Sequence, residues 1–407
     1  MKRVVFLLLL LLIIGSFFEL SARNTVVLTS KQSVTSQISS SDKGAIYIVR
    51  ESIDLNNKSI QLPQNAVLQF EGGALYNGDL IGNNATIVAG RYELFKTVTL
   101  TGNWILDGVP VEWFGAIPND VNQDCSEAIN TTINVGRKIS APALLGSGVY
   151  YTQKTIDIPD YGTLIGLSPS LTRICYYADA DVGVYMHGQY TTIRNICVEE
   201  NELGRKGICI KLGDRKTNVS STRGFVEDVK AIGGDCGLDL EYQWCNKISG
   251  VNCRYNNTGL YAYDTTPYVE NAVIEGNYRY GVYSEGFGIK LYNATIEGNR
   301  IGCVLNGKYN LLNNCYFEGN TASHLDKNAT KNLKGADIEG GNLYVGDITE
   351  VTDLVMISCL FVNDSKFNNT IRIDKCKNLT IMGCSSLKYL ETTKNCTVKY
   401  ADVPYRN

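Results

Sequence analysis

Histidine is nearly absent from this chain of 407 residues, which contains only His187 and His324. None of its 13 cysteines forms a Cys-x-x-Cys pair. These absences argue against a histidine-rich zinc site and against one built on paired cysteines. An excess of basic residues is also lacking, since 38 Lys and Arg stand against 41 Asp and Glu. The composition therefore gives no reason to expect a nucleic-acid partner.

The N-terminus has the pattern of an export signal. Two basic residues precede the apolar run Val4–Ile14, and small residues suited to cleavage lie at Leu20-Ser21-Ala22. This predicts a secretory signal peptide over residues 1–22. An uncleaved membrane anchor is the alternative, but the run is short for a membrane span, and the first cysteine, Cys125, is too distant for a lipoprotein anchor. We expect an exported chain, periplasmic, cell-surface or secreted, that is not embedded in a membrane.

One short phrase of sequence returns four times. Its glutamates are spaced by 22, 21 and 21 residues, which is typical of a solenoid whose turns bury apolar side chains only against one another. We expect the Gly and Asn of each phrase to form a tight corner, because both tolerate left-handed dihedral angles. The four copies are Ala272-Val-Ile-Glu-Gly-Asn277, Ala294-Thr-Ile-Glu-Gly-Asn299, Cys315-Tyr-Phe-Glu-Gly-Asn320 and Ala336-Asp-Ile-Glu-Gly-Gly-Asn342.

A second element of each turn is a short strand that opens with glycine, at Gly237, Gly259, Gly281 and Gly302. Small or apolar residues alternate along these strands with polar or aromatic ones, as in a strand with one buried face. The chain is therefore predicted to be all-β: a single-stranded right-handed parallel β-helix of about 21–22 residues per turn with one short capping helix. Residues 23–110 are expected to form an N-terminal β cap or first irregular coils, and residues 111–407 the β-helix.

Two further expectations follow from the repeat. Cys303 and Cys315 fall at inward positions, which favours stacked free thiols, with one or two disulfides as the alternative. The capping helix is expected near residues 124–134, with Asp124 as N-cap and Glu127 completing a capping box.

Five motifs follow one another between residues 111 and 175: Trp113-Phe-Gly-Ala116, the Asp-capped helix, Gly148-Val-Tyr150, Ile156-Asp-Ile-Pro159 and Leu164-Ile-Gly166. Together they resemble the entry of the pectate-lyase-like superfamily. The resemblance implies a right-handed parallel β-helix of the group that includes rhamnogalacturonan-degrading enzymes and phage tailspike depolymerases. The Asn-Thr-Asp, Asp-Asp and Gly-His-Gly motifs of polygalacturonase-type members are missing, and Asn119-Asp-Val-Asn-Gln-Asp124 replaces the usual Gly-Asp-Gly segment.

Ligands of a β-helix must contact outward residues, because the interior is packed. Tyrosine and tryptophan faces suit stacking on sugar rings, while carboxylates hold hydroxyl groups. A polar loop at residues 213–223 is expected to wall the resulting patch. Counting from the strand glycines gives two outward columns, Cys209, Asp239, Tyr261, Tyr283 and Val304, and Lys211, Glu241, Tyr263, Glu285 and Asn306, with Asp264 and Trp244 at the edge.

Glu241 and Glu285 are two turns apart, so their backbones are expected ~9.6 Å from each other. Carboxylates at such a separation can act as acid and base in inverting glycoside hydrolysis. Asp239 and Asp264 are further catalytic candidates, and Lys211, Trp244, Tyr261, Tyr263 and Tyr283 are candidates for substrate binding. The alternative is that all of these are solvated surface residues.

The glutamate ladder Glu275, Glu297, Glu318 and Glu339 has its own interpretations. Stacked like charges repel, so basic neighbours such as Arg279 and Arg300 are expected to neutralise them. A Ca²⁺ site is the alternative, and in a β-elimination lyase Arg254 or Arg279 would then abstract the proton or bind substrate. The expected cofactor is therefore none, or Ca²⁺.

The leading hypothesis is an exported carbohydrate-active protein that degrades a polysaccharide by hydrolysis or β-elimination. The alternative is a non-catalytic glycan-binding or adhesion β-helix. A structural spike subunit would show long apolar outward stripes, and the sequence has none.

Overall fold

The structure, a computed structural model, describes residues 23–321, 341–346, 351–362, 371–373, 375–387, 390–392 and 396–401. The predicted signal peptide and Glu339 lie outside the described residues. Within the described ranges, no helix is long and apolar enough to cross a membrane. The chain divides into two compact units, residues 1–106 and 107–407.

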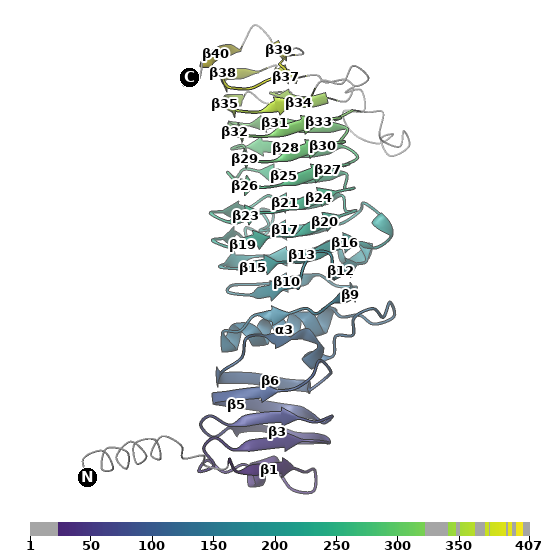
Figure 1. The fold of residues 1–407 in the computed structure, drawn as a ribbon, viewed down its shortest axis with the longest axis vertical. Coiled ribbons are helices and arrows are strands. Elements are labelled where there is room, and N and C mark those ends of the chain that lie inside the picture. The colour runs from purple at the N-terminus through teal and green to yellow at the C-terminus, as the bar shows by residue number, and fades with distance from the viewer. Residues whose placement is uncertain are drawn as a thin grey trace, which may run out of the picture. The chain divides into compact units, whose positions relative to one another are not determined.

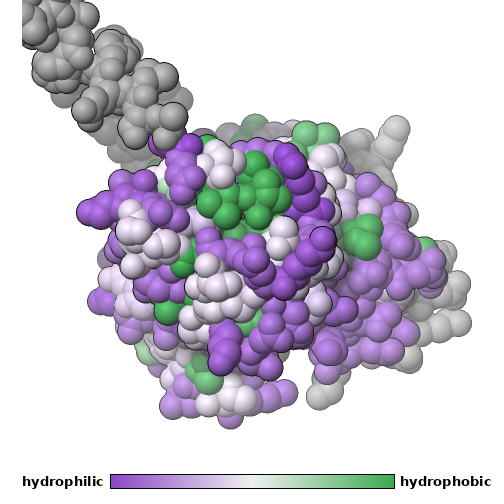
Figure 2. All heavy atoms as spheres, turned by 90° about the horizontal axis from the view of Figure 1, so that it is seen from below, coloured by the Kyte–Doolittle hydropathy of each residue, from purple (hydrophilic) through white to green (hydrophobic). Residues whose placement is uncertain are grey.

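The first unit contains parallel strands that pair at a regular spacing. Paired residues such as Thr25 and Ile46, or Val67 and Thr86, are 19 to 22 positions apart in sequence. The region predicted as a cap or irregular coils thus repeats with the period of a solenoid. Figure 2 looks onto the β1 end of this unit and shows polar side chains around an apolar patch. The elements are β1 (Thr25–Leu28), α2 (Val34–Gln37), β2 (Ile46–Val49), β3 (Ser52–Gln61), β4 (Val67–Phe70), β5 (Ala74–Val88) and β6 (Phe95–Trp104).

The second unit is a right-handed parallel β-helix, in which each sheet takes one strand from each successive turn (Figure 1). Three long sheets of ten, twelve and nine strands run along it, and a three-stranded sheet forms one corner. The predicted fold class is confirmed.

The ten-stranded sheet consists of β10 (Ile156–Ile158), β13 (Val182–Met186), β17 (Ile208–Leu212), β21 (Cys236–Leu240), β25 (Thr258–Tyr263), β28 (Tyr280–Gly286), β31 (Ile301–Gly307), β34 (Gly341–Val345), β37 (Ile371–Ile373) and β39 (Leu390–Thr392). The twelve-stranded sheet consists of β7 (Val109–Pro110), β8 (Ala143–Leu144), β11 (Thr163–Ile165), β15 (Thr192–Arg194), β19 (Phe225–Glu227), β23 (Lys247–Ser249), β26 (Tyr268–Glu270), β29 (Lys290–Tyr292), β32 (Tyr309–Asn313), β35 (Val351–Ile357), β38 (Cys376–Met382) and β40 (Thr397–Ala401).

The nine-stranded sheet consists of β9 (Gly148–Thr152), β12 (Thr172–Tyr176), β16 (Cys197–Glu200), β20 (Lys230–Ile232), β24 (Asn252–Arg254), β27 (Val273–Glu275), β30 (Thr295–Glu297), β33 (Tyr316–Glu318) and β36 (Leu360–Phe361). The corner sheet consists of β14 (Gly188–Gln189), β18 (Ser221–Thr222) and β22 (Gln243–Trp244). Short 3-10 helices are η1 (Val111–Phe114), η2 (Ala178–Ala180) and η3 (Asn201–Leu203).

The side chains predicted from the period-two alternation to point inward are the side chains that form the core. Leu238, Leu260, Val282 and Cys303 are aligned on four neighbouring strands, and all four are fully buried. All 13 cysteines are free thiols, and most are buried, so the interpretation as stacked thiols holds in this structure.

The asparagine of each repeat phrase lies inside the β-helix rather than at a left-handed corner. In the first three phrases only the preceding glycine is left-handed, as at Gly276 with φ +61°. Asn299 is fully buried: its Oδ1 accepts hydrogen bonds from the backbone N–H and the Nδ2 of Asn277, and its Nδ2 donates to the Oδ1 of Asn320. The prediction that both residues form the corner is therefore wrong for asparagine, whose amide serves to link the turns.

The helix of this unit, α3 (Ser126–Ile139), begins later and extends further than predicted. Cys125 occupies the N-cap position, and no side-chain cap bond is made there, so the predicted capping box is absent. Asp124 still accepts the N–H of Ser126 through Oδ1 at 2.9 Å. The helix buries Ile129 and Ile133 and contacts β8, β10 and β11. It thereby covers apolar side chains of the first turns of the β-helix.

Candidate functional site

The acid–tyrosine patch lies on the outer face of the ten-stranded sheet. Its members are Lys211, Asp239, Glu241, Tyr261, Tyr263, Tyr283 and Glu285, from strands β17 to β28 and the residue after β21. Lys211, Asp239, Tyr261 and Tyr283 form one column of directly paired residues. Tyr263, Glu285 and Asn306 form a second column beside it.

Both predicted columns are wrong at β17, where the sequence predicts Cys209 in the first column and Lys211 in the second. Lys211, not Cys209, is paired with Asp239, and Cys209 is fully buried. Gly207 is not equivalent to Gly237, because Ile208 pairs with Cys236. The N–H of Gly207 instead donates to Glu200, which organises the loop before β17. This shift brings a cation beside Asp239.

Asp239 is the most perturbed acid of the patch. Only 6% of it is exposed, and burial, despite the nearby Lys211 ammonium, raises its pKa from 3.8 to about 7. One of its oxygens accepts the backbone N–H of Glu241 at 3.0 Å. A carboxyl group with such a pKa holds its proton near neutral pH, which is the property required of a general acid.

The Lys211 ammonium is shared between carboxylates on either side. Its Nζ lies 3.5 Å from Asp214 and 3.6 Å from Glu241. These side chains are less than a quarter exposed, with 14% for Lys211 and 18% for Glu241. The cation thus compensates for the negative charge that gathers around Asp239.

Tyrosine rings continue the patch beyond Asp239. Tyr261 is stacked with Tyr263 at a centroid distance of 6.4 Å and with Tyr283 at 5.9 Å. The hydroxyl of Tyr283 donates to Glu285. Burial and the charges of Glu285, Asp239 and Glu241 raise the pKa of the Tyr261 hydroxyl. Burial is the largest cause of this shift, and the three acidic residues add to it.

A small hairpin borders the patch where the 213–223 loop was predicted. Asp214 and Val219 form an antiparallel bridge, and the Asn218 side chain accepts the hydroxyl of Tyr242 at 2.7 Å. Arg215 at the hairpin turn pairs with Asp264 and lies over the ring of Tyr263 at 4.7 Å. Sequence reasoning did not select Arg215 or Asp214, because their reach across turns has no periodic signal.

The remaining predicted residues lie elsewhere. Trp244 belongs to the corner strand β22 and contacts Tyr242 edge-on at 4.4 Å. Arg254 lies on the nine-stranded sheet, away from the patch column, and Arg279 lies over the ring of Tyr280 at 4.7 Å. The structure therefore does not bring Trp244 and Arg254 into the cluster around Asp239.

The glutamate ladder is confirmed as a column on the nine-stranded sheet. Glu275, Glu297 and Glu318 are directly paired from strand to strand. Arg254, one turn earlier in the same column, forms an ion pair with Glu275. No cluster of three or more His, Cys, Asp or Glu side chains arranged for metal binding occurs in the described part of the chain.

His187 also belongs to the ten-stranded face. Its Nε2 lies 2.9 Å from an oxygen of Asp157, and its ring is stacked on Tyr185 at 4.9 Å. Asp157 and Tyr185 continue the column of Lys211 in the opposite direction from Asp239. The column thus carries acids and tyrosines on both sides of the hairpin.

Comparison with known proteins finds similarity of fold only. No model of a known protein family matches the chain, and no curated protein sequence matches it. Among solved structures, the chain is similar to the N-terminal fragment of gene product 12 of bacteriophage phi29, with 12% identity and a TM-score of 0.49 over 72% of this chain and 57% of that one. It is similar to the gp42 tailspike of Acinetobacter phage vb_AbaP_AS12, with 10% identity and a TM-score of 0.46 over 74% of this chain and 63% of that one.

A third similar structure is the Agl-KA catalytic domain, with 11% identity and a TM-score of 0.35 over 73% of this chain and 69% of that domain. The chain thus spans less than two thirds of the length of both phage proteins. At this level of identity, likeness concerns the fold and not the chemistry.

Proposed function

We propose that this chain is an exported protein that binds a polysaccharide on the acid–tyrosine patch and cleaves it by acid–base hydrolysis. The observation that carries the proposal is Asp239, a carboxyl group 6% exposed with a pKa of about 7, surrounded by further carboxylates and stacked tyrosines. A buried acid with no function is costly to keep, and perturbed acids gather at catalytic sites. Membership of the pectate-lyase-like superfamily is part of the same proposal and rests on the motifs of residues 111–175.

The proposed reaction uses two carboxyl groups. Asp239 donates its proton to the glycosidic oxygen as the bond to the anomeric carbon breaks, and Glu285 takes a proton from the water that attacks this carbon. Tyr283, whose hydroxyl binds Glu285, orients that carboxylate. Glu241 is already engaged by Lys211 at 3.6 Å, so we assign it to charge balance rather than to proton transfer.

The rings of Tyr261 and Tyr263 provide the substrate platform. Their planes differ by only 6°, so both present similarly oriented faces. Such faces suit the apolar sides of pyranose rings. Arg215 over Tyr263 and Asp264 beside it supply hydrogen-bonding groups at the border of the platform.

β-Elimination is less well supported in the described part of the chain. It requires a base such as Arg254 or Arg279 and a Ca²⁺ ion, but Arg254 is engaged with Glu275 on a different sheet from Asp239. Binding of Ca²⁺ by the glutamate ladder stays a proposal. The assay below includes it for that reason.

Non-catalytic glycan binding is the second candidate function, and the stacked tyrosines favour it. Tyr261, Tyr263 and Tyr283 form an aromatic surface that would bind sugars even if no proton were transferred. Both functions require binding of the glycan, but only the hydrolase cleaves it. Variants of the two proposed catalytic acids, Asp239 and Glu285, therefore separate the two functions.

The test uses the purified protein without residues 1–22 and a panel of pectic, host-type and bacterial polysaccharides, with and without Ca²⁺. New reducing ends and the ultraviolet absorbance of unsaturated products are both recorded. We expect the wild-type protein to produce reducing ends without this absorbance. Asp239→Asn and Glu285→Gln should produce at least a hundredfold fewer reducing ends, whereas the control Glu270→Gln, on the twelve-stranded sheet, should produce as many as wild type. Binding without cleavage would support the glycan-binding function. Ca²⁺-dependent absorbance would show a lyase and refute the hydrolytic roles.

A further inference from the structure

The corner between the ten- and twelve-stranded sheets carries an exposed row of aromatic and basic side chains. Tyr161, Tyr190, Arg223 and Cys245 occupy equivalent positions in four successive turns. Tyr161 is 62% exposed and Tyr190 44% exposed, and their rings are stacked at 5.6 Å with an interplanar angle of 16°. The Arg223 guanidinium lies 6.0 Å from the centre of the Tyr190 ring. We call Tyr161, Tyr190 and Arg223 the corner strip.

The backbone of the corner strip is of a kind that bulky residues rarely adopt. Tyr161 and Tyr190 have φ values of +61° and +56°. Such values suit glycine, asparagine and aspartate, and a bulky side chain there is strained. The next corner, between the twelve- and nine-stranded sheets, follows this rule in six successive turns, with Asn195, Asp228, Gly250, Asn271, Asn293 and Asn314. Large exposed rings are thus kept at positions where the fold itself favours small residues, and strain that persists in this way is a sign of function.

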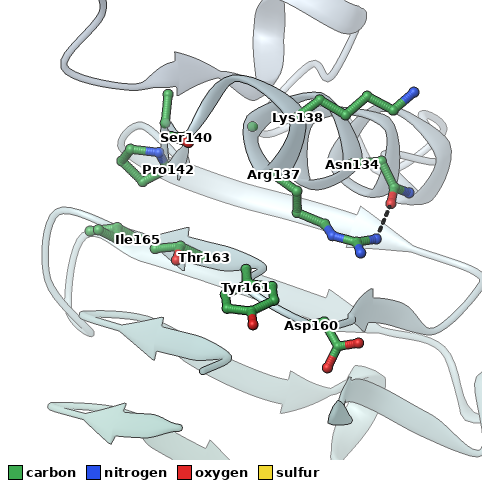
Figure 3. Close-up of a pocket in the computed structure, with 11 residues that line it drawn as sticks. Asn134, Arg137, Lys138, Ser140, Pro142, Asp160, Tyr161, Thr163 and Ile165 are labelled. Carbon is green, nitrogen blue, oxygen red and sulfur yellow. Dashed lines mark hydrogen bonds between the residues drawn. The ribbon is translucent and has the colours of Figure 1, made fainter. Parts of the chain in front are cut away.

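A cavity opens at the first residue of the strip. It has a volume of about 600 Å³ and is lined by the end of α3 and by β11 and the residues before it. Arg137, Lys138, Asp160 and Tyr161 all line it. Figure 3 shows the Arg137 side chain extending from α3 toward the level of Tyr161 and Asp160. Asp160 is held in place because its Oδ1 accepts the N–H of Gln189. Of the two basic side chains, only that of Arg137 points to the Asp160 side of the cavity (Figure 3).

We propose that the corner strip and this cavity form a second carbohydrate-binding site, separate from the acid–tyrosine patch, for an anionic polysaccharide. Stacked tyrosines present flat apolar faces to sugar rings. Arg137 and Arg223 present donors to carboxylate or sulfate groups, for which the guanidinium is geometrically suited. The turns of Tyr161 and Arg223 are two steps of ~4.8 Å apart, so the row alone extends about 10 Å along the stack. An extended chain would contact both tyrosines and the cavity at once.

Affinity electrophoresis tests this site without depending on cleavage. The protein carries Asp239→Asn, and native gels contain polygalacturonate, alginate or heparin, with neutral dextran as the control polymer. We expect retardation by at least one acidic polymer and none by dextran. If the polymer bound only at the acid–tyrosine patch, Tyr261→Ala and Tyr283→Ala would abolish the retardation of the protein, whereas variants of the corner strip would keep it. That result would overturn the proposal.

The strip variants can be chosen to keep the backbone conformation. Asparagine tolerates the left-handed region and occupies the next corner of several turns, so Tyr161→Asn with Tyr190→Asn should fold at least as well as the parent protein. We expect this double variant to bind the acidic polymer at least fivefold more weakly, and Arg137→Gln to weaken it further. Tyr309→Asn, at a tyrosine 50% exposed on the twelve-stranded sheet, is the matched control. Unchanged binding by the double variant, or no retardation by any acidic polymer, would refute the site.

Discussion

Replacement of Asp239 by asparagine should make the protein more stable at alkaline pH while it abolishes cleavage. The folded carboxyl group has a pKa of about 7 against an ordinary value of 3.8. Between these values the folded state keeps a proton that the unfolded state has lost, so the free energy of unfolding falls as pH rises. Below pH 3.8 both states are protonated, and above pH 7 both are ionised, so the full cost is present only at alkaline pH.

The magnitude follows from the size of the shift. A rise from 3.8 to about 7, at 1.36 kcal/mol per pKa unit, corresponds to a cost of about 4 kcal/mol for the ionised group. Asparagine has nearly the same shape and no charge. Urea denaturation of wild type and Asp239→Asn at about pH 5 and pH 9 measures the difference. It should be about 1.6 kcal/mol at the lower pH, where the unfolded carboxyl group is already ionised, and approach about 4 kcal/mol at the higher one.

The control is Asp264→Asn, because Asp264 is 34% exposed and pairs with Arg215. Its loss should give no alkaline gain in stability. If Asp239→Asn and wild type showed the same dependence of stability on pH, Asp239 would not be a carboxyl group with a raised pKa, and its assignment as the general acid would lose its basis.

Three other predictions concern the rest of the fold. Asn299→Ala should lower the free energy of unfolding by about 3–5 kcal/mol, because it leaves buried partners of the asparagine ladder without hydrogen bonds. Asn293→Gly, at an exposed corner, should change this free energy by less than about 1 kcal/mol in the same urea titration. Ellman's reagent should detect all 13 thiols after denaturation without a reductant, and in the native protein the exposed Cys245 should react first; a count lowered by two or more would indicate disulfides. Arg254→Gln should remove the ion-pair partner of Glu275, so the thermal midpoint should fall and be partly restored by millimolar Ca²⁺. A wild-type midpoint that Ca²⁺ raises by itself would show a native calcium site.

The sequence predicted best where the period is fixed. From Gly259 to Gly302 each turn has 21 or 22 residues, so alternation alone identified the buried Leu260 and Val282 and the outward Tyr261 and Tyr283. Each strand there is forced into register, because a slip by one residue would move its apolar side chains to the surface.

Prediction failed where turns carry insertions. The segment before β21 is longer than a repeat, so counting from Gly207 placed Cys209 outside and missed the pairing of Lys211 with Asp239. The reach of Arg215 across turns is set by the three-dimensional path of the hairpin and has no local pattern. The inward turn of Asn299 was missed because the same residue type is favoured both at left-handed corners and in buried amide ladders.

The most direct test of the account is the pH dependence of polysaccharide cleavage by wild type and Asp239→Asn, measured as new reducing ends on the best substrate of the panel. If Asp239 is the general acid, wild-type kcat/KM should decline tenfold per pH unit above about pH 7, and Asp239→Asn should be inactive at every pH while still binding the substrate. Cleavage by Asp239→Asn at the wild-type rate, or a wild-type profile that stays flat to pH 9, would contradict the assignment of Asp239 and with it the proposed hydrolytic site.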